Sequence, residues 1–71
     1  MERKLIQSTI VDLLKREGAL TVENLYKRTK KRHSDLTDDD LQKRLMRMEI
    51  QGLVKVYQMP RGKRRVELSR R

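Results

Sequence analysis

The apolar residues of this chain recur at helical spacing over most of its length, and the pattern is clearest between residues 36 and 53. There Leu41, Leu45 and Met48 stand at i, i+4 and i+7, so they share one face of a helix. A face of three large apolar side chains must be buried against other elements. The spacing therefore predicts a helix over 38–51 that packs on the core.

Signals at both ends of this stretch mark the same helix. Thr37 suits the N-cap, where its hydroxyl accepts a hydrogen bond from the backbone N–H of Asp40. Asp38 and Asp39 join Asp40 beside the positive end of the helix dipole. Gly52 supplies the left-handed conformation that commonly ends a helix. Both boundaries are therefore predicted independently of the apolar stripe.

Two shorter periodic stretches come first and predict helices over 2–17 and 22–31. Their apolar residues share one helix face, at Ile6, Ile10, Leu13 and Leu14 in the first and at Val22, Leu25 and Tyr26 in the second. Between the two helices, 19–21 is too short to stand alone, and we expect it to pair as a brief strand at a sheet edge.

The pattern changes from helical to extended near residue 53. Residues 53–58 are rich in β-branched and aromatic types, and 64–69 alternates with period two. Pro60 and Gly62 fall between these stretches in turn positions, which predicts a β-hairpin with a basic tip. The predicted core of the chain consists of Ile6, Ile10, Leu13, Leu14, Leu20, Leu25, Leu41, Leu45, Met48, Leu53, Val54, Val56, Val66 and Leu68.

Length and composition fit one small domain over 1–71, with neither an internal repeat nor a linker. A chain of this size removes only about 60% of its surface from water on folding, so its core must be small. The sequence contains no cysteine for a disulfide or a thiolate metal site, and no apolar run is long enough for a signal peptide or a membrane span. We therefore expect an intracellular protein, cytoplasmic or nucleoid-associated, without membrane contact.

The residue patterns of catalysis and metal binding are missing from the sequence. His33 is the only histidine and stands among cations, so we expect an exposed loop residue rather than a base or a ligand. The consecutive carboxylates at 38–40 point in different directions on a helix and lack the spaced ligands of a calcium loop. No glycine-rich phosphate loop or nucleophile motif occurs, so the sequence predicts neither an enzyme nor a cofactor.

The net charge is the most informative feature of the composition for function, because 19 Lys and Arg against 10 Asp and Glu give a formal net charge of +9. Such a balance favours a polyanionic partner bound through counterion release. The alternative is that the charges form solvated faces that serve solubility or heat stability. The cations gather in two clusters, Lys27, Arg28, Lys30, Lys31 and Arg32 at the end of the second helix and Arg61, Lys63, Arg64, Arg65, Arg70 and Arg71 at the hairpin tip and tail.

The order helix, short strand, helix, helix and hairpin is similar to that of winged-helix domains. Residues 45–54, LMRMEIQGLV, resemble the passage from the third helix into the wing of that superfamily, an apolar residue and Glu followed after two residues by Gly-Leu-Val. The resemblance implies a small α+β, three-helix winged helix-turn-helix fold with a C-terminal hairpin wing. It also implies binding to double-stranded DNA, as in small transcription regulators or chromatin-associated proteins, with the third helix in the major groove and the wing on the backbone or minor groove.

The candidate DNA contacts flank the third helix. Cations of both clusters would reach phosphates on either side of a groove, while Lys43 and Arg47 point outward between them. About six neutralised phosphates would give log K a slope near −5 against log salt. The candidate DNA-binding residues are Lys27, Arg28, Lys30, Lys31, Arg32, Lys43, Arg47, Arg61, Lys63, Arg64 and Arg65.

The third helix also supports a second interpretation. Its acidic first turn repels phosphate, and Met46 and Ile50 form an apolar pair on its outer face. The alternative is a protein–protein module that assembles, as a homodimer or with another protein, through this pair or through the first helix, although isolated surface hydrophobes are common. RNA is a weaker candidate than DNA, because two Tyr and no Phe or Trp leave few rings to stack on bases.

Overall fold

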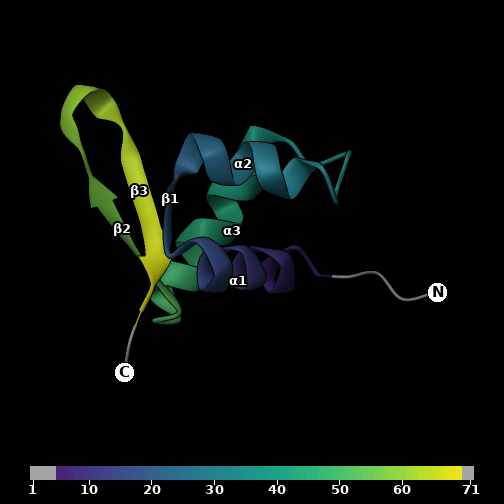
Figure 1. Cartoon of the computed structure of the whole chain (residues 1–71), viewed down its shortest axis with the longest axis horizontal. Helices are drawn as coiled ribbons and strands as arrows, with labels where there is room; N and C mark the ends of the chain where they lie inside the picture. Colours follow the sequence, from purple (N-terminus) through teal and green to yellow (C-terminus); the bar gives the residue numbers. More distant parts are fainter. Residues whose placement is uncertain (1–4, 70–71) are drawn as a thin grey trace.

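The computed structural model describes residues 5–69 and contains three α-helices and a three-stranded antiparallel sheet (Figure 1). This α+β layout confirms the predicted fold class and the predicted order of elements. The elements are α1 (Ile6–Glu17), β1 (Ala19–Thr21), α2 (Val22–Lys30), α3 (Asp38–Ile50), β2 (Val54–Gln58) and β3 (Arg64–Leu68), with a 3₁₀ turn at Pro60–Gly62 inside the hairpin.

The element boundaries follow the sequence signals. Beyond residue 17, each predicted helix and strand end lies within one residue of the observed one. The first helix begins at Ile6, because Leu5 is extended at φ −69° and ψ 140°; residues 2–4 of that prediction lie outside the described residues. Gly52 follows α3 at φ +79°, the left-handed conformation expected of it.

The sheet has β3 at its centre, with β1 on one side and β2 on the other. The predicted edge strand at 19–21 is therefore confirmed. Val66 is buried and Arg65 is exposed, because successive side chains of a strand point to opposite faces. One face therefore packs on the helices, and we call the opposite one the outer face of the sheet. By register it carries Ala19, Thr21, Lys55, Tyr57, Arg65 and Glu67.

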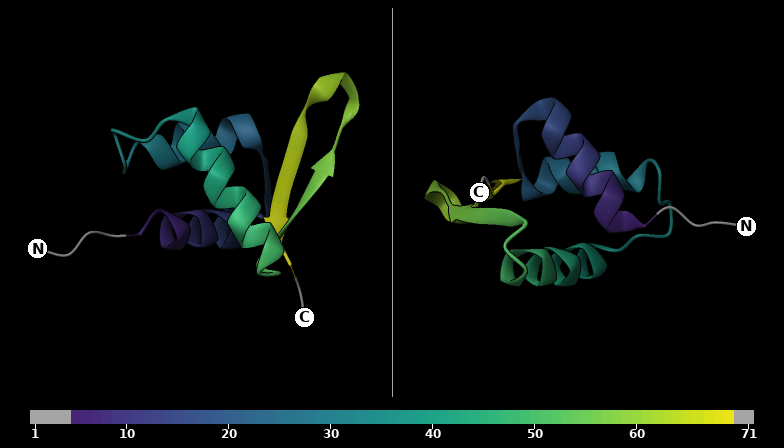
Figure 2. Two further views of the ribbon diagram at one scale, coloured as in Figure 1. Left: turned by 180° about the vertical axis from the view of Figure 1, so that it is seen from behind. Right: turned by 90° about the horizontal axis from the view of Figure 1, so that it is seen from below.

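The helices lie beside one another at one end of the molecule and the hairpin lies at the other. Seen from below, α1 and α3 occupy opposite sides of the helical part, and the hairpin stands at its end (Figure 2). The hairpin tip extends past the helices (Figure 1). The side chains of the tip are therefore separate from the surface of the helices. No helix among residues 5–69 has the length and apolar character needed to cross a membrane.

The core lies between the three helices and the inner face of the sheet. Nine of the predicted core residues are buried, and Ile6, Leu20, Val56 and Leu68 are partly buried against them. Leu53 was wrongly assigned to the core, since it is 37% exposed. Its N–H donates to the Met48 carbonyl at 2.9 Å, so Leu53 belongs to the turn that ends α3 rather than to β2. Two buried hydrophobic residues, Val22 and Leu36, and two buried threonines, Thr9 and Thr29, were not in the predicted core.

Candidate nucleic-acid interface

The first basic cluster stands at the end of α2. Burial of Leu25 and Thr29 turns the opposite side of this helix to solvent. Lys27, Lys31 and Arg32 are exposed there, and none has a carboxylate within 4 Å among residues 5–69. Cations in this position also interact favourably with the negative end of the helix dipole. The end of α2 therefore presents three cations that the fold itself does not use in ion pairs.

Two other cations of this cluster have partners inside the fold. The Arg28 guanidinium lies 2.8 Å from a Glu17 carboxylate oxygen at the end of α1. Lys30 Nζ donates to the Leu36 carbonyl at 2.9 Å and lies 5.6 Å from the centre of the Tyr26 ring. An exposed ion pair is weak, so Arg28 can exchange its carboxylate for a phosphate. Lys30 instead helps to hold the segment between α2 and α3.

The hairpin tip presents two further cations on a closed turn. The Met59 N–H donates to the Lys63 carbonyl at 2.8 Å, and Pro60 begins the 3₁₀ turn between them. Arg61 has φ +66°, a left-handed conformation that is uncommon outside glycine, and Gly62 follows at φ +72°. Arg61 and Lys63 are exposed, and neither has a carboxylate within 4 Å in the described part of the chain.

Arg64 and Arg65 point to opposite faces of the sheet. The Arg64 guanidinium donates to the side-chain oxygen of Gln42, which ties the base of the hairpin to α3. Arg65 lies on the outer face, level with Thr21 and Tyr57. The two arginines were predicted as one group of DNA contacts, but the fold places them on different surfaces.

A groove of about 270 Å³ separates the hairpin from the first turns of α2 and α3. Lys63 and Arg64 line its hairpin wall, and the carboxylates of Glu23 and Asp38 line its helical wall. The groove is therefore balanced in charge inside. The excess of positive charge lies beyond it, at the hairpin tip and at the end of α2.

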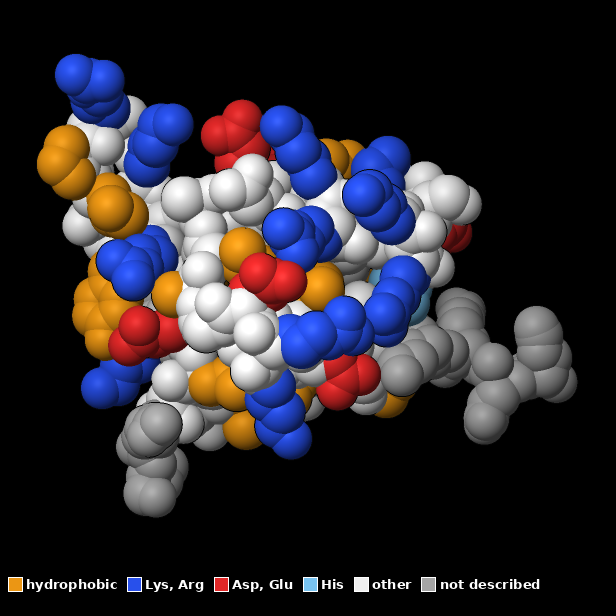
Figure 3. Space-filling model, in the orientation of Figure 1, with side chains coloured by type: hydrophobic (Ala, Val, Ile, Leu, Met, Phe, Trp, Pro, Cys, Tyr) orange, Lys and Arg blue, Asp and Glu red, His pale blue; other side chains and the backbone are white. Residues whose placement is uncertain are grey.

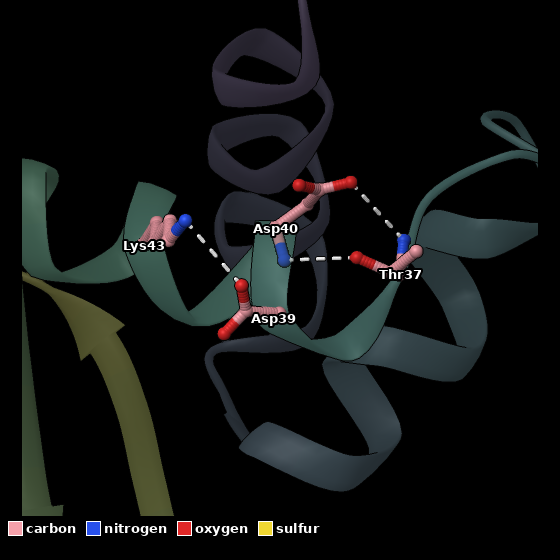
Figure 4. A network of polar contacts seen from close by, with 4 residues as sticks. All are labelled: Thr37, Asp39, Asp40 and Lys43. Atoms are coloured by element: carbon pink, nitrogen blue, oxygen red, sulfur yellow. Dashed lines mark hydrogen bonds and ion pairs between the residues drawn. The ribbon is translucent and has the colours of Figure 1, made fainter.

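The acidic first turn of α3 is largely a capping structure (Figure 4). The Thr37 hydroxyl accepts from the Asp40 N–H at 3.1 Å, and the Asp40 carboxylate accepts from the Thr37 N–H at 3.4 Å. This reciprocal pair is a capping box and confirms the predicted N-cap. Asp39 lies 3.4 Å from Lys43 Nζ, one turn further along the helix. Asp38 is the carboxylate of this turn that lines the groove.

The outer face of α3 is exposed and partly apolar, as predicted. Met46 and Ile50 are 63% and 80% exposed. Lys43 is paired with Asp39, while Arg47 lines a shallow hollow between α3 and the start of α1. Lys43 and Arg44 line the same hollow, with Asp40 as its one carboxylate among the described residues. The three cations of α3 therefore lie toward α1 and the acidic first turn, and they do not extend either basic cluster.

The charge is distributed unevenly over the elements. α3 carries four acidic and three basic residues, whereas residues 54–68 carry one acidic and five basic, and residues 22–36 carry two acidic and five basic. In the space-filling view, Lys and Arg side chains gather over the hairpin tip and over α2 (Figure 3). The positive field therefore comes from the elements beside α3 rather than from α3.

His33 is not the exposed loop residue that we expected. It is half-buried, and its Nε2 lies 2.9 Å from the hydroxyl oxygen of Thr9, a fully buried residue of α1. The His33 N–H also donates to the Thr29 carbonyl at 3.0 Å. The imidazole thus links the segment after α2 to α1.

Two groove residues, Glu23 and Gln42, were missed in the sequence analysis. Gln42 comes directly after Leu41, which belongs to the apolar stripe of α3, so a helical wheel places Gln42 at the edge of the buried face. Its partner Arg64 is 22 residues away, and only the packing of the hairpin against α3 brings the two together. Arg70 and Arg71 of the predicted second cluster lie outside the described residues.

No protein-family model, curated protein or solved structure matches the chain. The winged-helix resemblance therefore stays a prediction that rests on the sequence pattern and on the order of elements.

Proposed function

We propose that the protein binds double-stranded DNA, chiefly through the phosphates, as a small winged-helix protein of the transcription-regulator or chromatin-associated type. The observation that carries this proposal is the pair of cation clusters, at the hairpin tip and at the end of α2, beyond the groove between the hairpin and the helices. The exposed cations of these clusters that lack a carboxylate within 4 Å among residues 5–69 are Lys27, Lys30, Lys31, Arg32, Arg61, Lys63 and Arg65. Lys30 is hydrogen-bonded to the Leu36 carbonyl and Arg65 lies on the outer face of the sheet, so the other five carry the proposal.

Phosphate contacts position a protein on a duplex but carry no sequence information. Lys43 and Arg47 lie between the clusters in the proposed mode, yet the acidic residues of α3 offset their attraction for phosphate. We therefore expect a strong dependence on salt and a weak dependence on DNA sequence. With about six phosphates neutralised, the slope of log K against log salt is near −5.

A salt titration with a random duplex, followed by fluorescence anisotropy, tests the proposal. Arg61→Gln combined with Lys63→Gln removes two cations from the hairpin tip. Lys27→Gln combined with Lys31→Gln removes two from α2. Each pair should reduce the size of the slope by about 2, because each lost phosphate contact contributes about 0.9.

Two further variant pairs remove the same charge from other surfaces. Lys43→Gln with Arg47→Gln acts on α3 and should weaken binding less than either cluster pair. Lys15→Gln with Arg16→Gln acts on α1 and should leave duplex affinity unchanged. No measurable affinity at low salt, or equal losses for all four pairs, would contradict the proposal.

A second candidate function is self-association through α3. The supporting observation is the exposure of Met46 and Ile50, 63% and 80%, on one outer face. α3 has a formal charge of −1 in a chain of +9, so two copies can meet there without the repulsion that the basic clusters would cause. An apolar strip with charges of both signs beside it suits a small homodimer interface.

Sedimentation velocity distinguishes this candidate from a monomer. We expect a dimer that dissociates in Met46→Asp and in Ile50→Asp. Leu5→Asp is the matched control, because Leu5 is 66% exposed but precedes α1. A wild type that stays monomeric at all concentrations rules out self-association, and a dimer that only Leu5→Asp dissociates moves the interface to the first helix.

A further inference from the structure

The outer face of the sheet is a second polar surface, separate from the groove. The helix-facing side of the sheet packs on the core, whereas Lys55, Tyr57 and Arg65 on the outer face are exposed. Tyr57 is 42% exposed and stands directly opposite Arg65 across the β2–β3 pair. In the space-filling view, apolar, basic and acidic side chains mix along this side of the hairpin (Figure 3).

The Tyr57 ring is held in place although it is exposed. Its hydroxyl donates to a Glu67 carboxylate oxygen at 3.0 Å, and Glu67 lies on the neighbouring strand. A ring fixed at both ends loses little conformational freedom when a flat partner stacks on it. Tyr57 is therefore a preorganised aromatic platform on an open sheet.

Unpaired cations surround a hollow beside this platform. The hollow has a volume of about 910 Å³ and lies between the end of α1 and the sheet, where Lys15, Lys55 and Arg65 contribute to its lining. Two carboxylates also line it: Glu17 is paired with Arg28 at 2.8 Å, and Glu67 accepts from the Tyr57 hydroxyl and keeps its charge, so three cations face one carboxylate that has no cation partner in the described part of the chain. None of the three cations has a carboxylate within 4 Å among residues 5–69, so the hollow suits an anion.

We infer that the outer face of the sheet binds a single-stranded nucleic acid, with one base stacked on Tyr57 and the neighbouring phosphates at Lys55, Arg65 and Lys15. Stacking on an aromatic ring beside a basic groove is how single strands are bound without sequence preference. A duplex keeps its bases stacked inside, so it has no base to offer to this ring. The inference does not depend on duplex binding, since Arg65 is the only member of the two clusters that it uses, and the unpaired cations Lys27, Lys31, Arg32, Arg61 and Lys63 take no part in it.

Tyrosine fluorescence gives a direct readout of this contact. Tyr26 and Tyr57 are the two tyrosines and the chain has no Trp, so Tyr26→Phe leaves Tyr57 as the single emitter. Oligothymidylate and oligouridylate of about ten nucleotides are suitable probes, because neither pairs with itself and their length fits the usual site size. We expect either or both of them to quench Tyr57 emission at saturation.

Substitutions separate stacking from charge. Tyr57→Leu should weaken binding roughly 5- to 150-fold, the equivalent of about 1–3 kcal/mol for one stacked base, while Tyr57→Phe keeps the ring and should bind nearly as the wild type does. Lys55→Gln with Arg65→Gln should reduce the salt slope by about 1.4. The matched pair Arg16→Gln with Arg44→Gln removes the same charge from residues that belong to neither proposed surface and should leave single-strand affinity unchanged.

Three results would overturn the inference. The first is Tyr57 emission that neither oligonucleotide changes. The second is equal affinity of the wild type and Tyr57→Leu in a variant whose circular dichroism shows that it is folded. The third is equal quenching by a duplex or by polyglutamate of matched charge, since either would show that the surface responds to any polyanion.

Discussion

Two buried threonines, Thr9 of α1 and Thr29 of α2, offer a matched test of hydrogen bonding in this small core. Both are fully buried and both lie in helices. The Thr9 hydroxyl oxygen lies 2.9 Å from His33 Nε2, whereas the Thr29 hydroxyl has no hydrogen-bond partner among the described residues. We predict that Thr29→Val raises the free energy of unfolding and that Thr9→Val lowers it.

The expected magnitudes follow from this single difference. Valine keeps the β-branched shape and nearly the same helix propensity, so both variants exchange a hydroxyl for a methyl at little other cost. Removing a buried hydroxyl without a partner recovers about 1–3 kcal/mol of desolvation. Removing a bonded hydroxyl loses about 0.5–1.5 kcal/mol. The two variants should therefore differ by about 3 kcal/mol, or roughly 12–24 °C in Tm for a domain of this size.

Thermal and urea unfolding followed by far-ultraviolet circular dichroism measure this difference. The free energy of unfolding should fall with urea concentration at the same slope in both variants, because neither substitution changes the surface exposed on unfolding. If Thr29→Val melts at or below Thr9→Val, the hydroxyl of Thr29 is satisfied in solution and the reasoning is refuted.

Two further predictions concern the cap of α3 and the platform on the sheet. Thr37→Ala removes the bond from the Asp40 N–H and should cost about 1 kcal/mol in the same melts, while Thr37→Asn should restore the cap. The hydrogen bond to Glu67, with smaller contributions from burial and from the Glu67 charge, raises the pKa of the Tyr57 phenol. The neutral phenol is thus favoured by folding, so its stabilisation is present below the unfolded pKa of about 10 and is lost as pH rises through the folded pKa. Absorbance titration of Tyr26→Phe should show this raised pKa, and Glu67→Gln should lower it; equal midpoints would contradict the assignment.

The secondary structure was largely predictable because its signals are local. Apolar spacing marks the inward face of each helix, and threonine caps mark where α2 and α3 begin. Leu53 shows the limit of this reasoning. Leu53 follows Gly52 and precedes a run of β-branched residues, which suggests a strand. Its N–H instead donates to the Met48 carbonyl, so Leu53 belongs to the turn that ends α3.

Leu36 was missed although the sequence contains its signal. It directly precedes the N-cap Thr37, and Leu41 is the fourth residue of the helix, which is the spacing of a hydrophobic staple. Both leucines are buried in the same core. The Leu36 carbonyl also accepts hydrogen bonds from Tyr26 and Lys30, and these contacts depend on how the segment after α2 folds back.

The candidate site was predictable in composition but not in geometry. The sequence identifies which residues are cations, and exposure at the hairpin tip and along α2 followed from helix and turn patterns. It does not reveal that Arg28 meets Glu17, that Arg64 meets Gln42 or that Arg65 lies on the outer face of the sheet. Each of these contacts depends on the packing of elements that lie far apart in the chain.

The acidic first turn of α3 is the feature that most constrains the proposed mode of DNA binding. Asp40 completes the capping box and Asp39 forms an exposed ion pair with Lys43, so both contribute to the helix whatever it contacts. Asp38 lines the groove together with Glu23, opposite a hairpin wall with two cations. A phosphate placed inside the groove would meet as much negative as positive charge, whereas one at the hairpin tip or at the end of α2 would meet unpaired cations. The phosphate contacts should therefore lie at these two clusters, with α3 acting as the support that holds them apart.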